Sequence, residues 1–275
     1  MNRFSTCAGA ALVTALLATP FAPPSTAGDA SGAKRTLQVF AAASLADAFH
    51  ELAHRLEAER PGLAVRISLA GSQQLVAQLE QGAVADVFAS ADERWMSYAQ
   101  AQGLVSGEPA TFARNRLVVI VPKSNPARIG KLQDLSRGGV KLVLAAAAVP
   151  VGHYSRTVLR NLARVEGFPP DFATRALRNV VSEEDNVKSV VSKVQLGEAD
   201  AGFVYRSDIT PAVARYVRAF EIPERANVIA TYPLALLKDG PAPDVAKAFV
   251  DFVLSADGQR ILEQHGLMPV AANTR

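Results

Sequence analysis

The sequence is poor in cysteine and aromatic residues, and its charges form no block. Its 275 residues include one cysteine, one tryptophan and 7% aromatic side chains. Because Cys7 lies in a segment that we expect to be removed, the mature chain should form no disulfide, thiolate metal site or cysteine nucleophile. The low aromatic content argues against a base-stacking surface. The 29 Lys and Arg residues are scattered among 26 Asp and Glu residues, so we expect no nucleic-acid partner.

Long apolar runs are also missing. The apolar stretch from Ala8 to Leu17 is shorter than the roughly 20 residues that a membrane-spanning helix needs. It follows a weakly basic start and precedes Ser25-Thr26-Ala27, which offers small residues at a cleavage site. This pattern predicts a secretory signal peptide over residues 1–27, cleaved after Ala27, and a periplasmic protein. A retained membrane anchor is the alternative.

The rest of the chain alternates between short apolar runs and amphipathic stretches. We predict strands at 37–41, 63–69, 86–90, 117–121, 141–145, 201–205 and 228–237. We predict helices at 45–59, 73–81, 93–102, 154–164, 187–196, 242–254 and 259–265. This alternation is typical of parallel sheets covered by helices on both faces. In such sheets, ligands lie beyond the carboxyl ends of the strands.

Several strand-to-helix turns have the chemistry of an anion site. Ser44 and Ser72 each stand where a helix begins, and further turns precede the helices that follow Val151 and Val187. A helix start presents unpaired N–H groups and a partial positive charge. Several such starts aimed at one point would bind an anion without a formal cation. Taken singly, a serine at a helix start is more often a structural cap.

A set of motifs then carries a family resemblance that extends from about Thr36 to Gly266-Leu-Met-Pro269. The chain resembles the molybdate-binding proteins of ABC transporters, which are type II periplasmic binding proteins. The motifs are Phe40-Ala-Ala-Ala-Ser-Leu45, Ala85-Asp-Val-Phe-Ala-Ser-Ala-Asp92 with Trp95-Met96, Val149-Pro-Val-Gly-His-Tyr154, Glu184-Asp-Asn-Val187 and Gly202-Phe-Val-Tyr205 with Ser207-Asp208.

The resemblance implies an α/β fold of two lobes, each a mainly parallel sheet flanked by helices, with the ligand in the cleft between them. Lobe I would comprise residues 34–114 plus 229–275, and lobe II residues 115–228. The family's oxyanion ligands correspond here to Ser44, Ser72, Val151, Val187 and Tyr205, with Val151 and Val187 acting through backbone N–H groups. The implied partners are a membrane permease and its ATPase. Where many relatives have a second serine, this chain has Gln73.

The implied ligand set consists of hydrogen-bond donors and includes no carboxylate. Molybdate, a tetrahedral dianion, only accepts hydrogen bonds, whereas hydrogen phosphate carries a proton that needs an acceptor. Tungstate is nearly the same size as molybdate, so we expect both to bind. Sulfate has the same charge and shape but is smaller, and a site for another tetrahedral oxyanion such as sulfate is the alternative. We expect a monomer with no cofactor and no metal beyond the molybdate oxyanion.

One motif points to a different class of protein. His50-Glu51-Leu52-Ala53-His54 matches the zinc-peptidase pattern H-E-x-x-H. The helical periodicity places Leu45, Phe49, Leu52, Ala53 and Leu56 on the buried face and His50, His54 and Glu57 toward solvent. No third zinc ligand is recognisable, and no G-x-S-x-G turn indicates a serine hydrolase. We therefore predict a binding protein without catalytic residues, with the metallopeptidase as a remote alternative.

Overall fold

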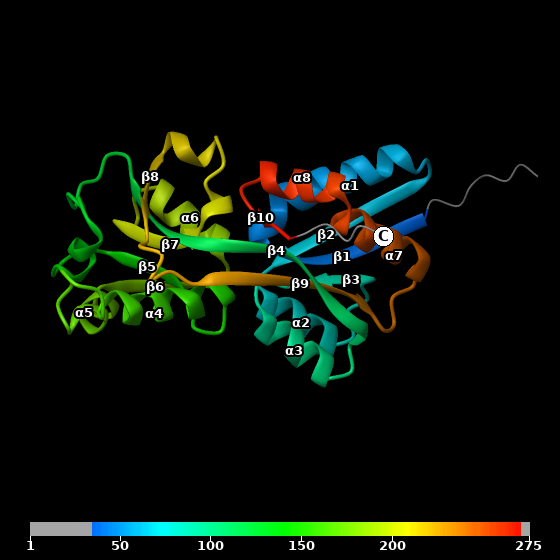
Figure 1. The fold of residues 1–275 in the computed structure, drawn as a ribbon, viewed down its shortest axis with the longest axis horizontal. Helices are drawn as coiled ribbons and strands as arrows, with labels where there is room; N and C mark the ends of the chain where they lie inside the picture. The colour runs from blue at the N-terminus through cyan, green and yellow to red at the C-terminus, as the bar shows by residue number, and fades with distance from the viewer. Residues whose placement is uncertain (1–34, 271–275) are drawn as a thin grey trace, which may run out of the picture. The chain divides into compact units, whose positions relative to one another are not determined.

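Two long strands, β4 (Val105–Pro122) and β9 (Ile229–Leu237), run through the middle of the described chain (Figure 1). The computed structural model describes residues 35–270. The two strands pair antiparallel as far as Arg116, opposite Ile229. From Leu117 onward, β4 pairs instead with β7 (Ala201–Tyr205). The strand order β2-β1-β3-β9-β4-β7-β5-β6 therefore continues from one lobe into the other through β4.

The first lobe contains both termini of the described chain. Strands β1 (Arg35–Ala42), β2 (Leu63–Ala70) and β3 (Val87–Ala89) are parallel to one another, and β9 adds to β3 in the antiparallel direction. The short β10 (Met268–Pro269) pairs with β4. The helices of this lobe are α1 (Ala46–Glu59), α2 (Ser72–Glu80), α3 (Glu93–Ala101), α7 (Pro243–Leu254) and α8 (Ala256–Gln264).

Alternation along the strands builds an apolar layer on each face of this sheet. In β1, Val39 and Ala41 pack into the layer beneath α1, α7 and α8, whereas Phe40 packs into the layer beneath α2 and α3. Successive strand residues point to opposite faces, so a nearly continuous apolar strand serves both layers. Figure 1 shows α2 and α3 on one side of the sheet and α1 and α8 on the other.

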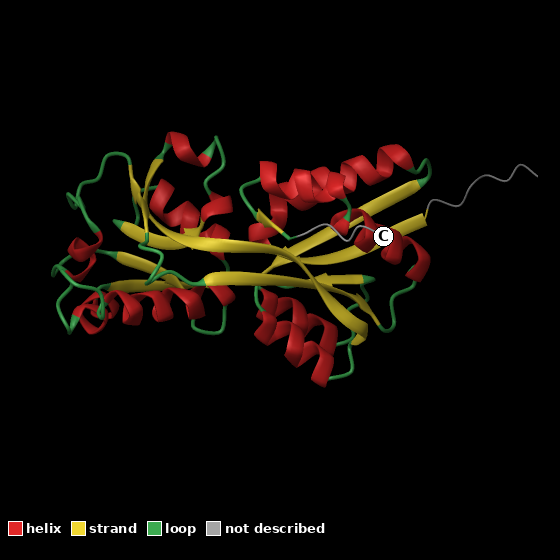
Figure 2. Ribbon diagram, viewed as in Figure 1, coloured by secondary structure: helices red, strands yellow, loops and turns green. Residues whose placement is uncertain are grey.

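The second lobe repeats this design on a smaller scale. Strands β5 (Leu142–Ala145), β6 (Val180–Glu184) and β7 are parallel, while β8 (Val217–Glu221) pairs antiparallel with β4. Helices α4 (Pro150–Leu162) and α5 (Phe172–Arg178) lie on one face, and α6 (Val187–Gln195) lies on the other (Figure 2). Four short 3₁₀ segments, η1 (Ala43–Leu45), η2 (Leu132–Ser136), η3 (Arg206–Asp208) and η4 (Val213–Arg215), complete the described elements.

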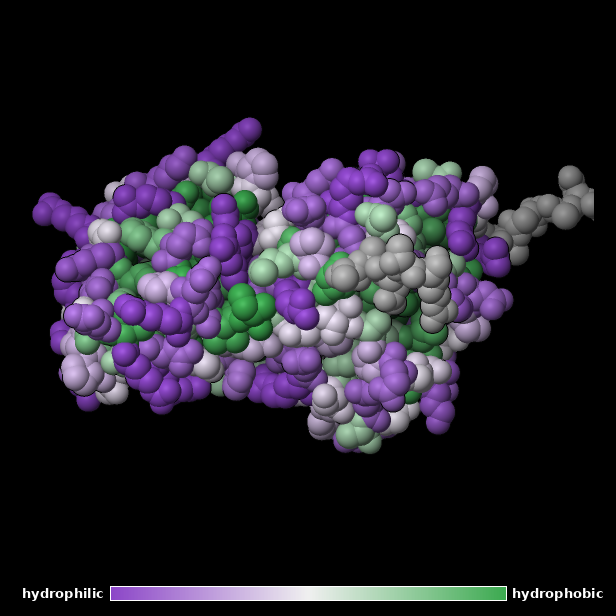
Figure 3. Space-filling view, viewed as in Figure 1, coloured by the Kyte–Doolittle hydropathy of each residue, from purple (hydrophilic) through white to green (hydrophobic). Residues whose placement is uncertain are grey.

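Hydrophobic and hydrophilic side chains are mixed on the surface that Figure 3 shows. On the face shown in Figure 3, hydrophobic side chains form separate patches among hydrophilic ones. Large exposed apolar residues such as Val84 and Leu196 are single positions, which is normal for a folded protein. Within residues 35–270, no helix combines the length and apolar character needed to cross a membrane.

The predicted two-lobed α/β fold is confirmed, and most predicted elements are present within a few residues. The prediction omitted α5, β6, β8, β10 and the first half of β4. It also began α4 at Tyr154, whereas the helix begins at Pro150. The lobe boundaries 34–114 plus 229–275 and 115–228 remain a prediction. The signal peptide at 1–27 and its cleavage after Ala27 lie outside the described residues.

Candidate functional site

A small pocket lies where strands of both lobes end and several helices begin. All five predicted site residues, Ser44, Ser72, Val151, Val187 and Tyr205, line this pocket. The other lining residues are Ala42, Ala43, Ala70, Gly71, Ala91, Val149, Pro150 and Asn186. The structure thus brings together turns that are far apart in the sequence. The role of the five residues in ligand binding remains a prediction.

The pocket suits a small solute. Its cavity volume is about 10 Å³, close to the space that a single water-sized body requires. Sites for larger organic ligands occupy about 300–1,000 Å³. None of the lining residues of the described chain carries a charged side chain. The polar groups that line it are hydroxyl groups, the Asn186 amide and backbone groups at helix starts.

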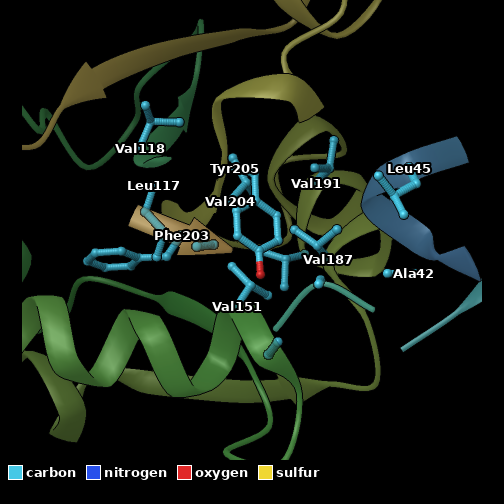
Figure 4. Close-up of a cluster of buried hydrophobic side chains, with 14 of the residues drawn as sticks. Ala42, Leu45, Leu117, Val118, Val151, Val187, Val191, Phe203, Val204 and Tyr205 are labelled. Atoms are coloured by element: carbon cyan, nitrogen blue, oxygen red, sulfur yellow. The ribbon is translucent and has the colours of Figure 1, made fainter. Parts of the chain in front are cut away.

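The Tyr205 hydroxyl is the most informative group in the pocket. The side chain is only 1% exposed, and among the described residues its oxygen has no hydrogen-bond partner. Figure 4 shows this oxygen beside Val151 and Val187, the residues at the starts of α4 and α6. Burial raises the pKa of Tyr205 well above its usual value, so the hydroxyl keeps its proton. It is an unused buried donor facing the pocket.

The two serines are held by neighbours within lobe I. The Ser72 hydroxyl oxygen accepts a hydrogen bond from the Ala91 N–H at 3.0 Å. The Ser44 hydroxyl lies 3.1 Å from the Tyr232 hydroxyl. Both serines are buried, at 0% and 7% exposure for Ser72 and Ser44. Each bond restricts the rotation of a hydroxyl group that lines the pocket.

The starts of α4 and α6 supply backbone donors from lobe II. Pro150 occupies the first turn of α4, where its missing N–H would have no partner within the helix in any case. Val151 therefore lies inside the first turn, which corrects the prediction of a turn preceding the helix. The side chain of Asn186 caps α6 by accepting from the Ser189 N–H at 3.1 Å. The N–H groups of Val151 in α4 and Val187 in α6 are left for other acceptors.

Contacts across the pocket rim hold the lobes together. The Arg94 guanidinium and the Trp95 indole N–H, both on α3, donate to the Ala148 carbonyl at 2.6 and 2.8 Å. The Gln73 amide donates to the Asp185 carbonyl at 2.9 Å. The sequence interpretation did not identify these contacts of Trp95 and Gln73. An apolar residue such as Ala148 gives no signal that its carbonyl accepts a bond from the other lobe.

Comparison with known proteins identifies the family. The family model described as bacterial extracellular solute-binding protein matches residues 37–268. The chain belongs to the bacterial extracellular solute-binding proteins. The resemblance predicted from the motifs is confirmed at this level.

Two relatives of the family are the molybdate-binding proteins ModA of Mycobacterium tuberculosis and Escherichia coli. The first is 42% identical over 242 residues, covering 88% of this chain and 87% of the relative. The second is 30% identical over 247 residues, covering 87% and 91%.

Solved structures support the fold assignment. The Azotobacter vinelandii periplasmic molybdate-binding protein aligns with a TM-score of 0.72 and 23% identity, covering 86% of this chain and 100% of that one. The sulfate-binding protein SubI of Mycobacterium tuberculosis aligns with a TM-score of 0.75 and 18% identity, covering 86% and 87%. At these identities, the likeness shows the fold alone.

A buried ion pair adjoins the site of this family member. Asp208 is fully buried, accepts from the Tyr205 N–H at 3.0 Å, and lies 3.4 Å from the Lys188 ammonium. Lys188 also lies 3.1 Å from Asp47 of α1. Burial raises the pKa of Asp208 to about 6, because it outweighs the opposing effect of Lys188. The Lys188 side chain thus connects the two lobes next to the start of α6.

The H-E-x-x-H segment is part of the lobe I surface. His50 and His54 are exposed, and Leu52 and Leu56 are buried as predicted. Glu51 lies 2.8 Å from the His265 imidazole and 3.6 Å from Arg55. Glu57, predicted to face solvent, instead accepts from the Val65 N–H at 2.7 Å. Among residues 35–270, no three metal-ligating side chains are grouped to hold an ion.

Proposed function

We propose that this protein captures molybdate, and also tungstate, in the periplasm and delivers it to the permease and ATPase of an ABC importer. The relatives from Mycobacterium tuberculosis and Escherichia coli, which match most of its length, are molybdate-binding proteins by name. We further propose that Ser44, Ser72, Val151, Val187 and Tyr205 bind the oxyanion. The Tyr205 hydroxyl is the strongest support for this proposal. A buried donor without a partner destabilises the folded protein unless a ligand accepts its hydrogen bond.

The chemistry of the pocket supports a fully deprotonated oxyanion. Its polar lining consists of serine and tyrosine hydroxyls, the Asn186 amide and the backbone at helix starts, with no carboxylate among the lining residues of the described chain. Each charge-assisted bond contributes about 1.5–3 kcal/mol. Helix starts α2, α4 and α6 add partial positive charge from both lobes. A dianion in this pocket is neutralised by dipoles rather than by a cation.

The same geometry suits a protein that binds and releases its ligand without catalysis. We propose that the lobes close on the anion by a hinge motion and that the protein acts as a monomer. The predicted boundaries place the hinge at residues 114–115 and 228–229, where the two crossing strands pass between the lobes. Ligand contacts from both lobes then favour the closed arrangement.

Calorimetric titration of the purified protein tests the proposal. Molybdate and tungstate should bind saturably with one site each, and sulfate and phosphate far more weakly. The Ser72→Ala variant should bind molybdate more weakly without unfolding, whereas His50→Ala on the exposed face of α1 should bind normally. Tight sulfate binding without molybdate binding would assign the site to the smaller oxyanion. Tight zinc binding that is abolished by His50→Ala would instead support a metal site at the H-E-x-x-H segment.

A further inference from the structure

A chain of buried polar side chains leads from the crossing strands to the pocket. Asn115 on β4 and Tyr232 on β9 are both fully buried, and neither lines the pocket. The Asn115 amide nitrogen lies 2.8 Å from the Ser207 hydroxyl and 3.5 Å from the Tyr232 hydroxyl. The Tyr232 hydroxyl in turn contacts Ser44. Buried polar groups at this density call for an explanation beyond packing.

The orientation of the Asn115 amide is fixed by the backbone. Its carbonyl oxygen accepts from the Arg116 N–H at 3.0 Å. The NH₂ group must therefore face Ser207 and Tyr232, and an amide nitrogen only donates. Toward Asn115, the Tyr232 hydroxyl consequently acts as an acceptor.

This orientation decides where the Tyr232 proton points. A phenol has one proton, and burial keeps it bound by raising the pKa of Tyr232 well above its usual value. Ser44 lies within hydrogen-bond distance at 3.1 Å. The neighbouring Tyr205 hydroxyl makes no hydrogen bond of acceptable geometry within the described chain. With Asn115 donating to its oxygen, the Tyr232 hydroxyl can direct its own proton to Ser44, and the Ser44 proton can then point into the pocket.

The Ser72 hydroxyl is oriented in a similar way, by a single neighbour. Its oxygen accepts from the Ala91 N–H, so its proton is likewise free for the pocket. Both serine hydroxyls are thereby oriented to donate a hydrogen bond to a ligand in the pocket. A serine without such a neighbour rotates freely and accepts a bond as readily as it donates one.

We propose that Tyr232 and Asn115 are positioning residues that hold the Ser44 hydroxyl as a donor and so make the site reject oxyanions that carry a proton. This inference rests on the proposed function of the pocket. A protonated anion such as hydrogen phosphate needs an acceptor, which the fixed serines do not offer. Removal of the Tyr232 hydroxyl frees Ser44 to rotate and to accept from such an anion.

Titration of the Tyr232→Phe variant with molybdate and with phosphate at mildly alkaline pH tests the inference. The Kd for molybdate should rise by about tenfold, the cost of one weakened charge-assisted bond. The Kd for phosphate should stay constant or fall, so that the ratio of the two constants changes by at least tenfold. In a Ser44→Ala background, Tyr232→Phe should leave that ratio unchanged, because the hydroxyl that it positions is gone.

Other outcomes overturn the inference. Equal weakening of both anions would mean that Tyr232 is only structural, and unchanged constants would mean that Ser44 needs no positioning. If Tyr232→Phe does not fold, Asn115→Ala carries the test: a changed ratio supports the inference, and an unchanged ratio overturns it. Failure of the wild-type protein to bind molybdate would instead refute the proposed function. The wild-type titration therefore separates the two questions.

Discussion

At the scale of single residues, the Tyr205 hydroxyl is expected to lower the stability of the free protein and to strengthen ligand binding. It is buried without a partner in the described chain, so it weakens the free protein and is available to a ligand. Tyr205→Phe should raise the Kd for molybdate by about 10- to 100-fold. The same change should leave the free energy of unfolding unchanged or raise it by about 1 kcal/mol. Calorimetry and urea unfolding measure the two quantities.

A matched control for that prediction is Tyr216→Phe, since Tyr216 is 59% exposed and lies away from the pocket. It should change neither the Kd nor the stability. If Tyr205→Phe lowers stability while leaving the Kd intact, the hydroxyl has a structural role and does not bind the ligand.

Asp208 gives the protein a pH-dependent stability. Its pKa of about 6 in the folded state lies above the ordinary value of 3.8, so the folded state binds the proton more tightly. The contribution of this group to stability therefore falls as the pH rises from about 4 to about 6, by up to about 3 kcal/mol. Asp208→Asn removes this loss and retains an acceptor for the Tyr205 N–H. Relative to wild type, the variant should gain stability as the pH rises.

Urea unfolding of both proteins between about pH 4.5 and 7.5 measures that difference. Lys247→Met, at an exposed position of α7, is a suitable control because Lys247 pairs with Asp251 of the same helix and not with Asp208. A difference between wild type and Asp208→Asn that does not vary with pH would contradict the prediction.

At the scale of elements, the sequence predicted the buried helices and strands well and the irregular ones poorly. β7 is a continuous apolar run, and its predicted bounds are those observed. The first half of β4 contains Gly107 and Pro109, and its register shifts between Ser106 and Ala110, so no regular alternation marked it. The start of α4 was missed because Pro150 and Gly152 usually indicate a turn. Proline in the first turn of a helix is nevertheless favourable.

Part of the candidate site could also be predicted from local sequence signals. Turns between regular elements carry local signals, and these pointed to Ser44, Ser72 and the helix starts near Val151 and Val187. Tyr205, the last residue of β7, came from the family resemblance alone. Asn115 and Tyr232 were missed because a polar residue in a strand gives no indication of its partner across the sheet. The contacts of Arg94 and Trp95 were missed because their acceptor is a backbone carbonyl in the other lobe.

Gly152 shows how tightly α4 is fitted to the end of β5. A Cβ atom on Gly152 would lie 2.0 Å from the Ala146 carbonyl oxygen and 2.4 Å from that of Ala145. Gly152→Ala should therefore displace the start of α4, destabilise the protein by about 1–3 kcal/mol and weaken molybdate binding. Gly138→Ala is the control, because a Cβ there meets no atom within 4 Å. Urea unfolding and calorimetry measure the effects, and a Gly152→Ala variant with wild-type affinity would refute the role of this turn.

At the scale of the whole molecule, the two lobes meet through a few specific bonds around the pocket. Two of them converge on the Ala148 carbonyl, which accepts from Arg94 and Trp95, adjacent residues at the start of α3. Arg94 also lies 5.4 Å from the centre of the Trp95 ring, which holds the two side chains together. The bonded carbonyl immediately precedes the residue that caps α4. In the proposed closure, the bonds to Ala148 would therefore form together with the placement of the α4 donors.

This coupling predicts a kinetic effect. A double variant, Arg94→Met with Trp95→Phe, removes both donors to Ala148 and keeps an aromatic ring against Tyr98. The two bonds exist only when the lobes are together, so their loss should act on ligand release. The dissociation rate of molybdate should rise by about 10- to 100-fold, as expected for two bonds of about 1 kcal/mol each. The association rate should change by less than about threefold.

Exchange of isotopically labelled molybdate measures the dissociation rate without relying on tryptophan fluorescence, which the variant lacks. Tyr98→Phe on the same helix is the control, because its hydroxyl bonds to Glu80 within lobe I rather than across the pocket, and it should release molybdate at the wild-type rate. A double variant with unchanged release would show that the bonds to Ala148 do not hold the closed arrangement. Slower association with unchanged release would place their action before closure, in the open protein.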